Sequence, residues 1–223
     1  IDNKSTFYRI SERHPDIKTL FIQNGMRSYH LDVFNELDNL GSDATNTFFV
    51  DQMLVFGPTI GEHYSKYIKG NIVSIGSIKN NFMRKEKLTR RGVLAFISHW
   101  QPCKGVYIKD TFFSFEKIWK RPNHLVIQCL MRYAKEKNKR LIIIPSKLSK
   151  EGLLSQEKDY FRGIMGVEPE FYKTSESYPS YQAVDSVELV VAIDSTLGYE
   201  SIARGKKNSN FFNPRYFVWR PKL

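Results

Sequence analysis

Seven residues at positions 194–200, with the sequence DSTLGYE, combine small hydroxyl side chains with a carboxylate directly after the apolar run 189–193. Such a run is typical of a buried strand, and the residues after Ser195 predict a helix that ends at Gly205. Backbone N–H groups at a helix start lack partners and carry partial positive charge, so they stabilise a phosphate. The residues expected to bind it are Asp194, Ser195, Thr196 and Gly198.

Glu200 lies one turn into the same predicted helix, where its carboxylate could accept hydrogen bonds from the two hydroxyls of a ribose. Ligands of open α/β sheets bind at the carboxyl ends of the strands, which is where this segment lies. The alternative is local: a Ser or Thr helix cap completed by Glu200 as a capping box. Both interpretations fit the segment taken alone.

Polar residues follow other apolar runs as well. His99 and Ser98 end the run 92–98, and His99 could donate to a phosphate or transfer a proton. Lys147 follows the run 141–144 and could neutralise a diphosphate. The alternatives are a packed ring for His99 and a solvated side chain for Lys147. A third group ends the run 18–23 and forms either a sugar contact or a plain turn: Gln23, Asn24 and Gly25.

Strand-like and helix-like segments alternate along the chain. Continuous apolar runs between helical patterns predict parallel sheets covered on both faces. The predicted strands are 18–23, 48–56, 71–77, 92–98, 141–144, 186–193 and 210–212. A helix is expected over residues 122–134, with Pro122 in its first turn. The polar stretch 79–91 divides the chain, which predicts a unit at 1–78, a connector at 79–91 and a second unit at 92–223.

Composition narrows the function further. The formal net charge is +11, which favours an anionic partner such as a phosphorylated metabolite, an anionic membrane surface or nucleic acid. No nucleic-acid-binding motif is present, so no specific nucleic-acid partner is expected. No Asp-x-Asp or cysteine–histidine metal motif occurs, and the cysteines at 103 and 129 are expected to be ordinary thiols. Without a signal core or a spanning apolar run, a cytoplasmic location is expected, with peripheral attachment to the inner face of the membrane.

Five segments together resemble the GT-B glycosyltransferases, and closely the bacterial surface-carbohydrate proteins of capsule and lipopolysaccharide biosynthesis. The segments are residues 21–25, 50–57, 75–81, 177–181 and 189–207. The resemblance implies an α/β protein of two Rossmann-like parallel-sheet units. The resemblance implies that the N-terminal, acceptor-side unit is incomplete in this chain, so that either the chain is a fragment or the missing part lies elsewhere, and that residues 92–223 form the nucleotide-sugar-binding domain.

The resemblance also implies an activity: metal-independent transfer of a sugar from a nucleotide-activated donor to a surface-polysaccharide or lipid-linked glycan acceptor. The donor would be a CMP-linked acidic sugar such as Kdo, or a UDP- or GDP-hexose, and no cofactor is expected. His99 and Asn24 are the expected catalytic residues, and Gln23 and Gly25 the acceptor-side ones. Ser98, Lys147 and Tyr181 join the residues of 194–200 at the donor.

Two other functions were compatible with the sequence. A nucleotide-sugar epimerase has the same two-domain fold, but it needs an acid/base set of carboxylates and histidine, of which only His99 is suitably placed. A non-catalytic basic module for binding or scaffolding would also explain the charge, and its binding would depend strongly on salt.

Overall fold

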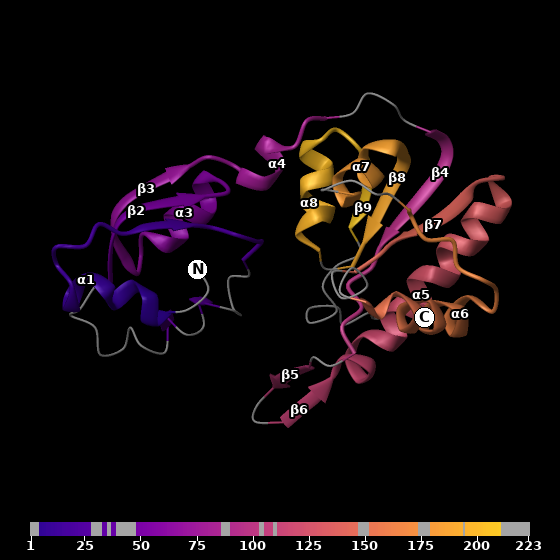
Figure 1. Ribbon diagram of the computed structural model, residues 1–223, viewed down its shortest axis with the longest axis horizontal. Coiled ribbons are helices and arrows are strands. Elements are labelled where there is room, and N and C mark those ends of the chain that lie inside the picture. Colours follow the sequence, from indigo (N-terminus) through magenta and orange to yellow (C-terminus); the bar gives the residue numbers. More distant parts are fainter. Residues whose placement is uncertain are drawn as a thin grey trace, which may run out of the picture. The chain divides into compact units, whose positions relative to one another are not determined.

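The chain divides into two compact units, Ile1–Arg84 and Lys85–Leu223, in the computed structural model (Figure 1). The model describes residues 5–27, 33–34, 37–38, 48–85, 90–102, 105–108, 111–146, 152–173, 179–193 and 195–210. The protein is a mixed α/β structure with small parallel sheets. The boundary between the units lies inside the stretch expected to be a connector, and helix α4 and the start of strand β4 also occupy part of that stretch.

The first unit contains a parallel sheet with the strand order β1-β2-β3. Its elements are η1 (Ser5–Arg9), α1 (Ile10–Arg13), β1 (Leu20–Ile22), β2 (Phe48–Val55), α3 (Pro58–Tyr64), β3 (Ile68–Ser74) and α4 (Ile78–Phe82). Alternate β2 residues Phe48 and Val50 are buried with Tyr8 in the core of this unit. The core therefore forms on one face of the sheet.

A polar clamp fixes the register of β1 against β2. The Asp51 carboxylate accepts from the Thr19 N–H at 2.8 Å and from the Thr19 hydroxyl at 3.0 Å, while the Asp51 N–H donates to that same hydroxyl oxygen at 3.0 Å. Lys18 adds an exposed ion pair at 3.0 Å. These donors, first of all the Thr19 N–H, hold the pKa of Asp51 below its usual value. A slip by one residue would break every bond of the clamp and move Phe21 out of the core.

The second unit is a three-layer α/β structure. Its sheet has the order β7-β4-β8-β9, with all neighbours parallel. The elements are β4 (Arg90–Ile97), β5 (Gly105–Ile108), β6 (Thr111–Ser114), α5 (Phe115–Glu136), β7 (Arg140–Ile144), α6 (Leu154–Met165), α7 (Pro179–Ser186), β8 (Val187–Ala192), α8 (Thr196–Ala203) and β9 (Lys207–Asn210).

Helices cover both faces of this sheet. One core cluster joins α5 and α6 to strand residues such as Phe96 and Ile143. The cluster on the opposite face joins α7 and the start of α8 to the alternate strand residues, such as Ala95 and Ile142 (Figure 1). Continuous apolar strands arise because both faces are buried, as expected from the sequence. The edge strand expected at 210–212 lies earlier, at Lys207–Asn210, and residues 211–212 fall outside the described part.

Helix α5 begins seven residues before Pro122, so the expectation that this proline marks the first turn was wrong. Ser114 caps the helix by accepting from the Lys117 N–H at 3.4 Å. An interior proline costs a helix about 3 kcal/mol. Burial of Phe115 and Trp119 in the first turns offsets this cost. Within the described residues no helix is long and apolar enough to cross a membrane.

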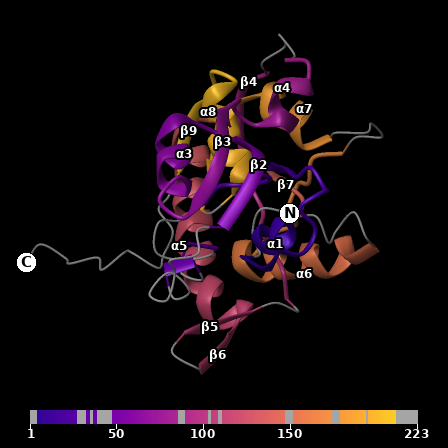
Figure 2. The same cartoon turned by 90° about the vertical axis from the view of Figure 1, so that its left-hand side faces the viewer.

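An antiparallel hairpin, β5–β6, precedes α5 and was not expected from the sequence. Gly105 pairs with Ser114, and Ile108 pairs with Thr111. Figure 1 and Figure 2 show the hairpin extending from the N-terminal end of α5. Phe112 on this hairpin is 51% exposed, so the hairpin adds an apolar side chain to the surface near the helix start.

Candidate functional site

The carboxyl ends of β4, β7 and β8 meet at one edge of the second sheet. The register pairs Ile97 with Ile144 and Phe96 with Val191, and the Ser98 N–H continues the ladder by donating to the Ile144 carbonyl at 3.0 Å. The segment Ser98–His99 therefore leaves the sheet beside the segment that leads from β8 to Ser195. Residues from two predicted groups are thus brought to the same edge.

The edge between β4 and β8 is a topological switch point. The chain leaves β4 for β7 through α5 on one face of the sheet, and it leaves β8 for β9 through α8 on the other face. Open α/β sheets bind ligands outside the carboxyl ends of strands at such a point, because the two diverging connections leave space there.

Helix α8 starts at this switch point with its cap position unused by a side chain. Ser195 has extended backbone angles, φ −139° and ψ 129°, and its hydroxyl makes no capping hydrogen bond. The third residue of the helix is Gly198, so Glu200 lies too far along the helix to complete a capping box. The capping-box alternative is therefore wrong, and the first turn keeps its partial positive charge for a ligand. Asp194 lies outside the described residues.

Glu200 and Tyr181, both expected at the nucleotide, contact each other directly. The Tyr181 hydroxyl donates to Glu200 Oε2 at 2.8 Å, and Glu200 is only 6% exposed. Burial, and then the bond to the Glu200 carboxylate, raise the pKa of Tyr181 well above its usual value. The phenol is therefore neutral and donates its proton to Glu200.

A buried ion pair supports these two residues. Arg204 donates from Nε to Asp185 Oδ1 at 2.8 Å and from its second terminal nitrogen to the other oxygen, and their side chains are 3% and 0% exposed. The Arg204 guanidinium also lies 5.4 Å from the centre of the Tyr181 ring. Residue spacing is a partial signal for this network: Tyr181 and Asp185 are four residues apart on α7, and Glu200 on α8 lies four residues before Arg204, the C-cap of that helix.

His99 is enclosed by aromatic rings and lacks hydrogen bonds. Its ring centre lies 4.3 Å from that of Trp119 and 5.6 Å from that of Phe115, both edge-on. Neither ring nitrogen has a hydrogen-bond partner among the described residues. Burial lowers the pKa of His99 to about 4, so the imidazole is neutral at pH 7. Buried polar groups of native proteins are seldom left unpaired, which makes this side chain the exception that needs a cause.

The end of β7 is held by Glu157, a residue that sequence reasoning did not select. The Ser146 N–H lies 3.2 Å from each Glu157 carboxylate oxygen, and the Ser146 hydroxyl donates to Oε2 at 2.9 Å. Glu157 is fully buried on α6. A lone glutamate in a helical pattern is typical of a solvent-exposed position. No sequence signal therefore indicated that Glu157 anchors the end of β7. Lys147, expected at the same strand end, lies outside the described residues.

In the first unit, the three predicted residues at the end of β1 make contacts within that unit. Gln23 is 3% exposed; its oxygen accepts from the Phe56 N–H at 2.8 Å, and its nitrogen donates to the Gly25 carbonyl at 2.8 Å. Asn24 Oδ1 accepts from Arg27 at 2.9 Å. Gln23 thus ties the carboxyl ends of β1 and β2 together.

The second unit also carries surface hollows that these residues do not line. One lies on α5, and the other is lined by Arg140 at the amino end of β7 and by residues 168–173. Across the described ranges, no group of three or more histidine, cysteine, aspartate or glutamate side chains could hold a metal ion.

Comparison with known proteins identifies a family for the chain. No protein with a curated description matches the chain. A family model described as "putative O-antigen biosynthesis protein" matches residues 20–220, which cover most of both units and every predicted site residue. This match indicates a role in the biosynthesis of a surface carbohydrate. Because the model covers most of the chain, the protein belongs to this family of O-antigen biosynthesis proteins.

Proposed function

We propose that the protein is a glycosyltransferase that moves a sugar from a nucleotide-activated donor to a glycan acceptor during O-antigen synthesis. The donor binds to the second unit at the switch point between β4 and β8. The observation that carries this proposal is the pair of His99 nitrogens at the carboxyl end of β4, for which the described residues offer no hydrogen-bond partner. The family's role in surface-carbohydrate biosynthesis supports it, because glycan assembly needs activated sugars.

The donor phosphates bind at the first turn of α8. Ser195 spends no hydroxyl bond on capping this turn, and its hydroxyl and that of Thr196 are the side chains nearest the helix start. The helix dipole there equals roughly half a positive charge. Developing negative charge on the leaving nucleotide is stabilised by these groups, so the transfer needs no metal ion in this scheme.

His99 binds the donor and orients it. A neutral imidazole offers one N–H donor and one acceptor nitrogen, which suit a phosphate oxygen and a sugar hydroxyl. With a pKa of about 4 the ring is a weak base in the unliganded protein. A bound diphosphate raises that pKa again, because a nearby negative charge favours the imidazolium form. Proton transfer by His99 is therefore coupled to donor binding.

Glu200 and Tyr181 form the nucleoside side of the proposed site. Because the Tyr181 hydroxyl already donates to Glu200, the Glu200 carboxylate is held in place, and a ribose hydroxyl donates to it in this orientation. The acceptor side belongs to the first unit, where Asn24 and Gly25 follow β1. Gln23 supports that loop through its bonds to Phe56 and Gly25 rather than by contacting the acceptor.

The test is nucleotide binding by calorimetry and thermal shift, with CMP, UDP, GDP and their sugars as ligands. His99→Phe fills the same aromatic surroundings without nitrogens, and we expect it to lose at least 10-fold in affinity, about 1.4 kcal/mol. Glu200→Gln keeps an acceptor for Tyr181 and loses the charge-assisted ribose bonds; because Glu200 already accepts from Tyr181, we expect a smaller loss than for His99→Phe.

The matched control is His14→Phe, since His14 is exposed on the first unit. It should bind like the wild type. If no nucleotide or nucleotide-sugar binds the wild type, or if both histidine variants bind equally well, the proposed donor site is refuted.

A further inference from the structure

The outer face of α5 carries a line of positive charge. Four exposed cations and the exposed His124 lie along one side of the helix at spacings of four, three, eight and three residues, and we call them the α5 stripe: Lys117, Arg121, His124, Arg132 and Lys135. Residues three, four or eight apart share one helix face. The stripe spans 19 residues, or about 27 Å for 18 rises of 1.5 Å. The opposite face packs into the core through Trp119, Ile127 and Leu130.

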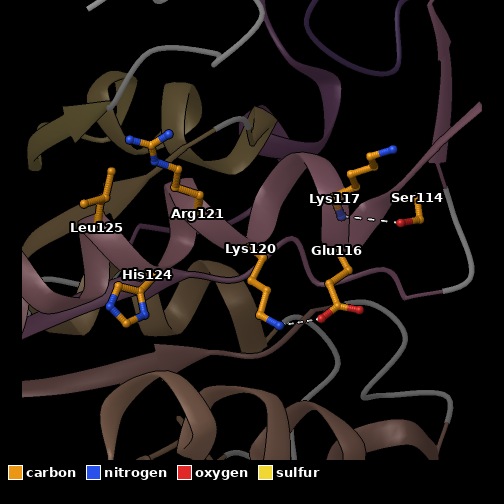
Figure 3. A pocket seen from close by; sticks show the side chains of 7 residues that line it. All are labelled: Ser114, Glu116, Lys117, Lys120, Arg121, His124 and Leu125. Atoms are coloured by element: carbon orange, nitrogen blue, oxygen red, sulfur yellow. Dashed lines mark hydrogen bonds and ion pairs between the residues drawn. The ribbon is translucent and has the colours of Figure 1, made fainter.

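The stripe is not neutralised within the described part of the chain. The nearest acid, Glu116, pairs with Lys120 at 2.6 Å, outside the stripe, and Glu136 lies at the end of the helix. No stripe residue forms an ion pair with any residue that the structure describes. Figure 3 shows Lys120 turned onto Glu116, while Arg121 and Lys117 point away from that pair.

Apolar side chains are exposed beside the stripe. Leu125 is 55% exposed and Tyr133 39%, both on α5, and Phe112 of the neighbouring hairpin is 51% exposed. An open hollow of about 710 Å³, lined by Ser114 and by residues of the first three turns of α5, lies over the same region (Figure 3). Of these side chains, Leu125 lines the hollow together with Lys117, Arg121 and His124, so an apolar group lies among the cations at this end of the stripe.

We propose that the α5 stripe docks the protein on an anionic lipid bilayer. Phospholipid headgroups supply a plane of negative charge that matches a straight, exposed row of cations, and each Lys or Arg near such a plane strengthens binding about 5-fold. Leu125 enters the boundary between headgroups and acyl chains, which a nucleic-acid backbone does not offer. This surface lies on the helix face opposite the aromatic wall of His99, and the proposal is independent of the donor site.

The test is co-sedimentation of the whole chain with vesicles of phosphatidylcholine alone and of phosphatidylcholine mixed with phosphatidylglycerol. The wild type should bind the anionic vesicles only, and added NaCl should weaken the binding. The triple variant Lys117→Gln, Arg121→Gln, Arg132→Gln should bind about 100-fold more weakly, from three cations at about 5-fold each. Glutamine is a good helix former, so α5 stays folded, which circular dichroism verifies.

The matched control removes three exposed lysines of the first unit, as Lys66→Gln, Lys69→Gln, Lys79→Gln. It has the same net charge as the stripe variant and should bind within a few-fold of the wild type. Equal losses in the two triple variants would show that net charge alone acts, and would overturn the stripe. Two other results would overturn the proposal too. One is binding of the wild type to neutral vesicles, and the other is binding of double-stranded RNA that competes with the vesicles and is lost to the same extent in the stripe variant. Nucleotide binding, measured in parallel, is unaffected in the stripe variant.

Discussion

Replacing His99 with phenylalanine should make the protein more stable while removing its proposed function. The neutral ring buries one donor and one acceptor without partners in the described structure. A buried unsatisfied polar group costs about 1–3 kcal/mol. Phenylalanine removes both groups and keeps the edge-on contacts with Trp119 and Phe115, although its larger ring costs part of the gain. We expect the free energy of unfolding at pH 7 to rise by about 1–2 kcal/mol.

The pH dependence gives a second, independent measure of the same residue. The pKa of His99 is about 4 in the folded protein against the ordinary 6.5. The unfolded chain therefore binds more protons between these values, and stability falls as the pH falls from 6.5 toward 4. Over the whole range, protonation linked to His99 lowers the free energy of unfolding by about 3 kcal/mol, and about 2 kcal/mol of this loss occurs between pH 7 and pH 5. The variant lacks this loss.

Urea unfolding at pH 7 and pH 5, for the wild type and His99→Phe, measures both effects. The difference between the two proteins isolates His99 from the other groups that titrate in this range. A variant less stable than the wild type at pH 7 by more than about 1 kcal/mol would mean that the imidazole has a strong partner. If the difference in the free energy of unfolding between the wild type and the variant is the same at pH 7 and pH 5, the His99 ring is not buried and neutral. Either result removes the reason for assigning His99 to a ligand.

Two further predictions concern the supports of the site. Asp185→Asn removes the charge that pairs with the buried Arg204 and should lower the free energy of unfolding by about 3–5 kcal/mol. The control Asp159→Asn, in an exposed ion pair, should lower it by at most about 1 kcal/mol. Urea unfolding of the two variants compares these losses. Glu157→Ala removes the acceptor of the Ser146 N–H and hydroxyl and should cost about 1–3 kcal/mol, with faster amide exchange at Ser146. Slow exchange in that variant would refute the anchoring role of the carboxylate.

The parallel strands were predictable because burial on both faces leaves a direct trace in the sequence. Residues 141–144 and 187–192 are nearly continuous apolar runs, and the structure places them in the second sheet as β7, which lies beside β4 at one end of the strand order, and as the inner strand β8. The β5–β6 hairpin leaves a weaker trace. Its strands are joined by Lys109-Asp110, which lacks the Asn-Gly or Asp-Gly pattern typical of a two-residue turn.

Helix α5 was mispredicted at its start because local and tertiary preferences disagree. Pro122 favours a helix beginning near it, but Phe115 and Trp119 gain enough from burial to extend the helix back to Ser114. Partner choice for Glu157 and Arg204 left little local trace in the sequence. Glu157 bonds to Ser146, 11 residues before it, and Arg204 bonds to Asp185, 19 residues before it, and these separations exceed the three- or four-residue spacing that a helix pattern reveals.

The structure changes the relative weight of the predicted site residues. Gln23 already uses its amide within the first unit, and Glu200 already accepts from Tyr181; a ligand gains less from a polar group whose hydrogen bonds are made. His99 and Ser195 differ, because the imidazole has no partner among the described residues and the serine hydroxyl does not cap its helix. Their unused hydrogen-bonding capacity lies at one sheet edge, next to a helix N-terminus. A phosphate-bearing ligand can bond to the imidazole, to the serine hydroxyl and to the helix N-terminus at once. His99 and Ser195, rather than Glu200, are therefore the first residues to mutate.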